Sequence, residues 1–169
     1  MSTTPDEHKV HAPRSVRCAV VTISDTRTRA TDTGGQEIVD RLAAAGHEIV
    51  LQELIPDEIE TIQQVLTQIV SRGDADAILL TGGTGITRRD TTYEAVSGML
   101  SKALPGYGEL FRMLSFAEIG PAAMLSRATG GLIDRTVVLA MPGSRAAVRL
   151  ALEKIILPEL AHLVWEARR

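Results

Sequence analysis

Continuous runs of apolar residues alternate, in the first half of the chain, with segments whose apolar residues recur every three or four positions. The runs at 16–23 and from Ala77 onward predict strands buried on both faces of a parallel sheet, and residues 48–55 predict a further strand between them. The apolar stripes at 38–45 and 59–70 predict helices between those strands. Strand, helix, strand, helix, strand is the order of right-handed crossover units, so this half predicts a parallel sheet in an α/β fold.

The second half continues the pattern with shorter elements. The Gly120-Pro121 pair is expected to break a long helix, and Pro158 predicts a kink in the last helix. The predicted segments are a helix at 91–100, a turn at 104–108, a helix at 109–125, strands at 126–132 and 136–141, and a last helix from Ser144.

Polar residues before three predicted helices have the spacing of helix caps. Residues 33–36 match a capping box for the first helix, and Thr91 or Thr92 is expected to cap the third. Asp57, with Glu60 three residues later, matches a capping box for the second helix. Spacing alone therefore predicts a structural role for Asp57.

Large apolar side chains gather between the predicted turn and the fourth strand. We expect most of them in the core, with Trp165 anchoring the last helix, and any excess would mark a subunit interface. The side chains concerned are Tyr107, Phe111, Met113, Leu114, Phe116 and Met124.

Length and charge restrict the class of protein. A chain of 169 residues is enough for one domain with a core and too short for two, so we expect a flexible arm at 1–15 and a single domain at 16–169. The net charge of −3 gives no basic field for nucleic acid or an anionic membrane. No apolar run approaches the ~20 residues that span a bilayer, so no membrane partner is expected.

The amino-terminal arm and the single cysteine predict a cytoplasmic protein. The arm has no hydrophobic core like that of a signal peptide, and Cys18 has no second cysteine for an internal disulfide. His8 and His11 lie in the arm without further ligand residues, which is typical of a solvated tail rather than a metal site.

A glycine-rich turn follows the third predicted strand, at Thr81-Gly82-Gly83-Thr84-Gly85. Glycines allow a ligand close to the backbone, and their amides before a helix form a concavity suited to an anion, with Arg88 and Arg89 adding positive charge. The alternative is a turn that only makes a tight bend. The segment has neither the P-loop ending nor the G-x-G-x-x-G spacing, which argues against a Walker-type nucleotidase and a nicotinamide dehydrogenase.

Strand ends of a parallel sheet meet at one edge, so several loops are expected to converge there. The glycine turn with Asp90, the Pro56-Asp57 segment and Pro142-Gly143-Ser144 would share that edge. Asp25, at the end of the first strand, is either a turn residue or a further site residue. A carboxylate beside phosphates requires a cation between them, so Asp90 and Asp57 predict Mg²⁺-dependent phosphoryl or nucleotidyl chemistry.

These segments resemble the MoaB/MogA family of molybdenum cofactor biosynthesis, which includes the gephyrin G domain. The resemblance covers roughly 17–158, and the segments 109–116 and 140–144 look like the MoaB branch. The matching segments are Ile23-Ser24-Asp25, Ile55 to Glu58, Thr81 to Ala95, Pro105 to Glu109, Leu125-Ser126-Arg127 and Met141 to Ser144.

The resemblance implies a fold and a reaction. The fold would be a three-layer α/β sandwich with a mostly parallel sheet and helices on both faces. The assembly would be a homotrimer, or a hexamer of two trimers. Molybdopterin and ATP would be substrates, with Mg²⁺ as cofactor, and adenylyl transfer to the terminal phosphate of molybdopterin would release pyrophosphate.

The resemblance also implies residue roles. Asp57 and Asp90 would be the essential aspartates, acting through Mg²⁺. The residues implied to bind molybdopterin or nucleotide are Ser24, Asp25, Thr81, Gly82, Gly83, Thr84, Gly85, Arg89, Thr92, Ser126, Arg127, Pro142, Gly143 and Ser144.

Two other functions stay open at this point. One is a molybdopterin-binding oligomer that stores or delivers the pterin without catalysis. The other is a related fold acting on another nucleotide, as in the CinA family, which the short chain disfavours.

Overall fold

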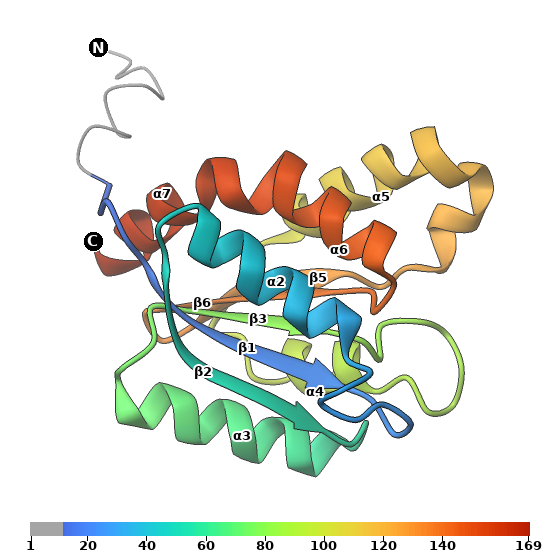
Figure 1. The fold of residues 1–169 in the computed structure, drawn as a ribbon, viewed down its shortest axis with the longest axis horizontal. Helices are drawn as coiled ribbons and strands as arrows, with labels where there is room; N and C mark the ends of the chain where they lie inside the picture. Colours follow the sequence, from blue (N-terminus) through green and yellow to red (C-terminus); the bar gives the residue numbers. More distant parts are fainter. Residues whose placement is uncertain (1–11) are drawn as a thin grey trace.

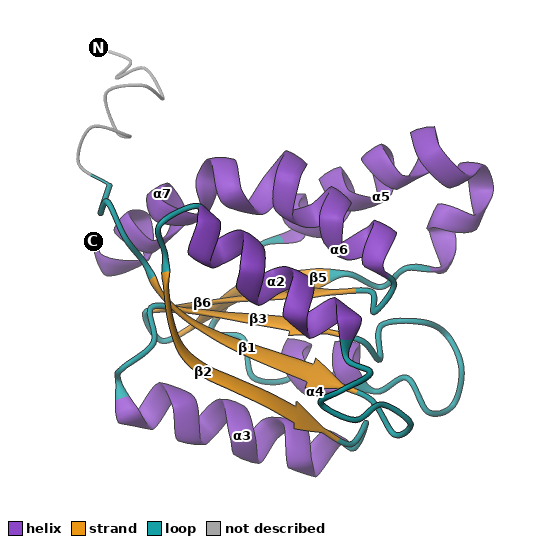
Figure 2. Cartoon of the chain, viewed as in Figure 1, coloured by secondary structure: helices purple, strands orange, loops and turns teal. Residues whose placement is uncertain are grey.

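The computed structural model describes residues 12–169 and shows a central sheet between two layers of helices (Figures 1 and 2). Most of the predicted arm and the His8/His11 pair therefore lie outside the described residues. The strands are β1 (Arg17–Ile23), β2 (Glu48–Ile55), β3 (Ala77–Thr81), β4 (Lys102–Ala103), β5 (Thr129–Ile133) and β6 (Thr136–Met141). The helices are α2 (Thr33–Ala44), α3 (Ile59–Arg72), α4 (Thr92–Ser97), α5 (Pro105–Ile119), the 3₁₀ helix η1 (Gly120–Leu125), α6 (Arg145–Ala151), the π-helical η2 (Leu152–Ile156) and α7 (Leu157–Arg168).

The sheet is mixed and mostly parallel. Its strand order is β2-β1-β3-β6-β5-β4. The pairs β2–β1, β1–β3 and β3–β6 are parallel, whereas β5 is antiparallel to both β6 and β4. The carboxyl ends of β1, β2, β3 and β6 therefore open onto one edge, as the sequence predicts.

The central strands are mostly apolar because both of their faces are covered. Along β1, Cys18 and Val20 point into one hydrophobic cluster, while Ala19 and Val21 point into the other. Successive side chains of a strand face opposite sides, so a strand between two helical layers needs an apolar residue at every position.

Helices cover the two faces unequally. Helices α2, α5, α6 and α7 pack on one face, and α3 and α4 on the other (Figure 1). In α3, the buried side chains Ile62, Leu66 and Ile69 form the predicted stripe. The predicted α/β sandwich with helices on both faces is confirmed.

Two predicted helix caps are wrong, and a third is right in position but lacks the side-chain bond. Asp32, not Thr33, caps α2, because its carboxylate accepts a hydrogen bond from the Gly35 amide. Glu58 occupies the N-cap position of α3 and makes no side-chain cap bond, so Asp57 does not cap this helix. Thr91 occupies the N-cap position of α4 without capping it, since its hydroxyl donates to Asp57 instead. Spacing identified residues that can cap, but long-range partners decided which ones do.

Several element boundaries also differ from the prediction. The predicted turn at 104–108 is largely the first turn of α5, with Pro105 at a position where its missing N–H costs nothing. The break at Gly120-Pro121 is present, with Gly120 at a φ of 64°. Strand β5 begins at Thr129, so 126–128 belong to a loop. The irregularity near Pro158 is a π-helical turn at 152–156 that precedes it.

The apolar residues of α5 and η1 divide into buried and exposed sets. Tyr107 and Phe111 are buried in the core beneath α5. In contrast, Met113, Phe116 and Met124 are 60%, 59% and 76% exposed. The core thus buries only part of this apolar surface.

Trp165 is half-buried in α7, with the Arg169 guanidinium 4.7 Å from its ring centre. Among the described residues, none of the helices combines the length and apolar character needed to cross a bilayer.

Candidate functional site

The glycine-rich turn packs directly against the neighbouring strand ends. Gly82 has a φ of 104°, and a Cβ there would overlap the carbonyl oxygen of Ile23 at the end of β1. On its other side, a Cβ on Gly143 would lie 3.3 Å from the Gly82 Cα. Only glycine allows this approach, which brings the ends of β1 and β3 and the loop after β6 together.

The turn presents unused backbone donors. The Gly82 amide donates to the carbonyl of Met141. Within residues 12–169, the amides of Gly83, Thr84 and Gly85 donate no hydrogen bond. Consecutive unpaired amides in a glycine turn before a helix are typical of an anion-binding site.

Asp57 lies over this turn from the loop after β2. Its Oδ1 accepts hydrogen bonds from the Thr91 amide at 3.0 Å and the Thr91 hydroxyl at 2.7 Å. Its Oδ2 faces Gly83 so closely that a Cβ on that glycine would overlap it. The side chain is buried at 6% exposure, and Thr91 holds its position.

Asp90 approaches the same turn from the opposite end of the loop. Its Oδ2 accepts from the Thr87 amide at 2.8 Å and the Thr87 hydroxyl at 2.6 Å. A Cβ on Gly85 would lie 2.9 Å from that oxygen. One oxygen of Asp90 is therefore anchored by Thr87, and Oδ1 has no hydrogen bond in the described part of the chain.

Asp25 joins the two acidic loops through hydrogen bonds. It accepts from the Asp57 amide at 3.1 Å and from Arg89 Nε and Nη2 at 2.8 and 2.6 Å. The Arg89 guanidinium, followed by the Asp57 amide, holds the pKa of Asp25 below its usual range. The positive charge expected from Arg89 is thus largely balanced by Asp25.

The remaining predicted residues of this edge have structural partners. The Ser24 hydroxyl accepts from the amides of Thr26 and Arg27, which shapes the turn after β1. The Thr81 hydroxyl donates to the Pro142 carbonyl at 3.1 Å and so links β3 to the loop after β6. Ser144 accepts from the Ala147 amide at 3.2 Å and caps α6.

Thr92 is a buried hydroxyl beside the glycine turn. Its residue is 0% exposed, and its Oγ1 has no hydrogen-bond partner in the described structure. A Cβ on Gly83 would overlap this oxygen as well as the Asp57 carboxylate. An unpaired buried hydroxyl is rare, and here it lies at the turn with the unused amides.

Arg127 reaches the glycine turn from the loop before β5. Its amide donates to the Thr84 carbonyl, and its Nε and Nη2 donate to the carbonyls of Gly85 and Asp90. Ser126 lies on the other side of this loop, where its carbonyl accepts from Arg112 at 3.5 Å. Arg127 thus lies at the predicted site, whereas Ser126 faces a separate cavity.

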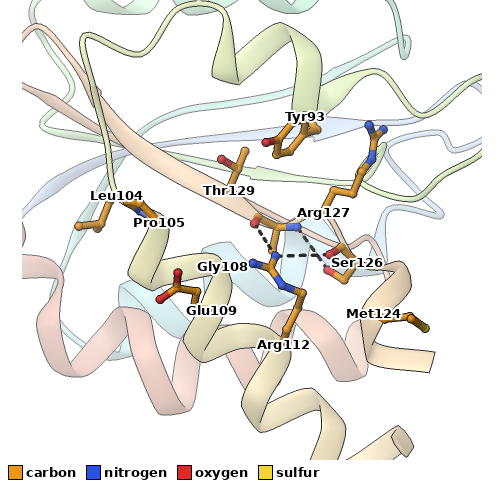
Figure 3. A pocket seen from close by; sticks show the side chains of 11 residues that line it. Tyr93, Leu104, Pro105, Gly108, Glu109, Arg112, Met124, Ser126, Arg127 and Thr129 are labelled. Atoms are coloured by element: carbon orange, nitrogen blue, oxygen red, sulfur yellow. Dashed lines mark hydrogen bonds between the residues drawn. The ribbon is translucent and has the colours of Figure 1, made fainter. Parts of the chain in front are cut away.

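That cavity has a volume of about 460 Å³ and opens between α4, α5 and the loop before β5 (Figure 3). Tyr93 and Arg127 line it on one side, and Leu104, Glu109 and Arg112 on the α5 side. Met124 extends it towards the exposed apolar residues of η1. Arg127 therefore separates this cavity from the glycine turn.

Three contributors to the site were missed or misassigned from the sequence. Thr87 anchors Asp90, Thr91 anchors Asp57, and Glu94 pairs with Arg127. The Thr87-x-x-Asp90 spacing is a local side-chain-to-backbone pattern and could have been found. The other two contacts join distant segments, for which the sequence gives no periodic signal.

The fold and this edge define a class of protein: an α/β protein whose glycine turn has unpaired amides and is flanked by two aspartates at the ends of parallel strands. Residues 19–162 match a family model described as "Probable molybdopterin binding domain". The chain is 54% identical over 164 residues to the molybdenum cofactor biosynthesis protein B of Bacillus cereus, covering 96% of this chain and 97% of that protein.

Solved structures agree with this match. A crystal structure of molybdenum cofactor biosynthesis protein B has a TM-score of 0.90 at 54% identity and covers 94% of this chain and 99% of that one. The tungsten cofactor synthesizing protein MoaB from Pyrococcus furiosus has a TM-score of 0.84 at 37% identity, covering 94% and 100%. The chain belongs to the MoaB/MogA family of molybdopterin-binding domains. The resemblance stated from the sequence is confirmed.

Proposed function

We propose that this chain acts in molybdenum cofactor biosynthesis, where it binds molybdopterin and transfers an adenylyl group from Mg-ATP to its terminal phosphate. The observation that carries the proposal is the meeting of two aspartates from separate loops on one glycine turn, Asp57 over Gly83 and Asp90 beside Gly85. The names of the relatives support the pathway and the pterin ligand. The adenylyl transfer itself is what the family resemblance implies, and the position of the two aspartates at the glycine turn supports it.

Under this proposal, Asp57 and Asp90 would together hold one Mg²⁺ ion. Each uses one oxygen in an anchoring contact, Asp57 with Thr91 and Asp90 with Thr87, and leaves the other without a hydrogen bond in the described chain. Mg²⁺ is commonly held by one or two carboxylates together with phosphate oxygens and water. Within residues 12–169, no three His, Cys, Asp or Glu side chains gather as a ready-made metal site. The proposal assigns the remaining ligands to substrate phosphates and water.

The protein would act mainly by positioning and by neutralising charge. The amides of Gly83, Thr84 and Gly85 would donate to phosphate oxygens, with the buried Thr92 hydroxyl as a further donor. An oxygen of the molybdopterin phosphate would attack the α-phosphorus of ATP. The bond to the bridging oxygen would break, and pyrophosphate would leave with the electron pair. Bound Mg²⁺ would offset the charge on these oxygens. Such chemistry needs orientation more than covalent help.

Incubation with molybdopterin and Mg-ATP tests the proposal, with pyrophosphate release as the readout. We expect release by the unmodified protein. Asp57→Asn and Asp90→Asn should each lower turnover by at least about 10²-fold, because the amide leaves phosphate charge unbalanced. Molybdopterin binding, followed by fluorescence, should stay largely intact. Asp74→Asn is the matched control, since Asp74 lies at the opposite end of the sheet.

The same experiment identifies the alternative function. Tight molybdopterin binding with no pyrophosphate release from any nucleotide would indicate a carrier that stores or delivers the pterin. Equal loss of molybdopterin binding and turnover in Asp90→Asn would show that Asp90 shapes the pocket instead of acting in transfer.

We further propose that the chain forms a homo-oligomer, a trimer or a hexamer of two trimers, through the outer face of α5 and η1. Large apolar side chains are exposed together on this face, which a monomer in water rarely keeps. They are Leu110, Met113, Phe116, Ile119, Met124 and Leu125. The cavity of Figure 3 is continuous with this face through Met124, so a neighbouring copy would border it.

A further inference from the structure

The guanidinium of Arg127 closes the neck of the loop that carries Asp90. Its Nε donates to the Gly85 carbonyl at 2.6 Å, and its Nη2 donates to the Asp90 carbonyl at 2.8 Å. These two carbonyls flank the exposed excursion 86–89, in which Ile86 is 66% exposed. One side chain thus ties together the two ends of an exposed segment whose other bonds in the described chain are those of Thr87 with Asp90 and of Arg89 with Asp25.

Further contacts fix the guanidinium itself. Its Nη1 pairs with the Glu94 carboxylate, and its Cζ lies 5.2 Å from the centre of the Tyr93 ring. The Arg127 amide also donates to the Thr84 carbonyl at 2.9 Å, inside the glycine turn. All three guanidinium nitrogens therefore donate to the protein, so an arriving phosphate would have to compete with these bonds.

We propose that Arg127 is a positioning residue: it fixes the Asp90 carboxylate relative to the glycine turn and does not contact phosphate. The family resemblance had implied a direct binding role for it. The planar fork of an arginine can hold two backbone carbonyls and a carboxylate at once, whereas a lysine ammonium on a flexible stem cannot reproduce that arrangement. The inference rests on the proposed adenylyl transfer only for its kinetic readout.

Arg127→Lys tests the inference because it keeps the charge and removes the fork. Opening the neck should let Asp90 move by an ångström or more, so we expect kcat to fall about 10²-fold while the KM for Mg-ATP changes much less. Trypsin provides a readout independent of catalysis. Cleavage after Arg88 and Arg89 should accelerate at least about tenfold under native conditions, since proteolysis follows the population of the open loop.

Arg72→Lys is the matched control. It makes the same exchange at an arginine whose guanidinium, in the described chain, bonds only Asp74, at the opposite end of the sheet, so trypsin cleavage at Arg88 and Arg89 and kcat should stay close to those of the unmodified protein. Cleavage in Arg127→Lys should be confined to Arg88 and Arg89. Faster cutting at Arg41 and Arg72 in the helices as well would indicate general unfolding and contradict a local role.

Two outcomes would overturn the inference. A rise in the KM for Mg-ATP that accounts for the whole loss of kcat/KM, with unchanged trypsin cleavage, would make Arg127 a direct phosphate ligand. If no form of the protein turns over nucleotide, the proposed reaction fails and trypsin cleavage alone tests the positioning role. Accelerated cleavage at Arg88 and Arg89 in Arg127→Lys would then support that role, and unchanged cleavage would refute it.

Discussion

Gly83 lies between the Asp57 carboxylate and the buried Thr92 hydroxyl, and its φ is 62°. No side chain can be added there without moving one of these groups. The position that requires a glycine therefore also carries one of the unpaired amides to which we assign the substrate phosphates.

Gly83→Ala should separate activity from folding. The added methyl group overlaps the Asp57 carboxylate, so we expect pyrophosphate release to fall by about 10²-fold. Backbone strain should lower the free energy of unfolding by roughly 1–3 kcal/mol, leaving the chain folded. Activity assays and thermal unfolding measure the two effects. Gly106→Ala is the control, because a Cβ there meets nothing within 4 Å. Full activity in Gly83→Ala would show that the site tolerates a displaced Asp57.

At the scale of helices and strands, the sequence predicts what depends on local pattern and fails where distant partners compete. The central strands could be placed because both faces are buried, which leaves an uninterrupted apolar run such as Ala77 to Leu80. The helix caps could not, because Asp57 and Thr91 satisfy the capping pattern yet bond to each other across 34 positions.

The candidate site shows the same division. Sequence reasoning could bring Asp57, Asp90 and the glycine turn to one edge, because parallel strands end together. It could not show that Asp25 balances Arg89 or that Arg127 faces two backbone carbonyls. Side-chain orientation at a loop is set by tertiary contacts, and no period in the sequence encodes them.

The exposed apolar face of α5 leads to a prediction about assembly. Phe116 is 59% exposed, so Phe116→Glu should leave the monomer fold within about 0.5 kcal/mol of its original stability. The charge would instead be buried between copies, where it is strongly unfavourable. We expect sedimentation velocity to show a trimer or hexamer for the unmodified chain and a monomer for the variant. Gln68→Glu on the exposed face of α3 is the control, and an unchanged assembly in Phe116→Glu would place the interface elsewhere.

The candidate site and a stabilising ion-pair cluster around Asp76 lie at opposite ends of the sheet. The candidate site occupies the carboxyl edge of the parallel strands. At the opposite edge, Asp76 joins the starts of β1 and β3 to the end of α7: its carboxylate accepts from the Arg17 amide at 3.0 Å, from Arg17 Nη2 at 2.6 Å and from Arg168. Burial alone would raise the pKa of Asp76, but the bonds from Arg17, with the Arg168 charge, hold it below its usual range.

This arrangement predicts how stability depends on pH. Because the pKa of Asp76 is lower in the folded chain than in the unfolded one, its contribution is complete above about pH 4 and is lost as the pH falls through the folded value. Asp76→Asn should lower the free energy of unfolding at pH 7 by roughly 1–3 kcal/mol, since the bonds from Arg17 and Arg168 lose their charged, buried acceptor.

Denaturant titrations from pH 7 to 2 measure this contribution. The loss of stability on acidification should be smaller in Asp76→Asn than in the unmodified chain, and the two curves should converge at the lowest pH. Asp74→Asn is the matched control, because the neighbouring Asp74 forms only an exposed pair with Arg72, worth about 0–1 kcal/mol. Parallel curves for the unmodified chain and Asp76→Asn would contradict the assignment. Pyrophosphate release at pH 7 should be unaffected in both variants, because neither residue lies at the edge of the sheet where the substrates are proposed to bind.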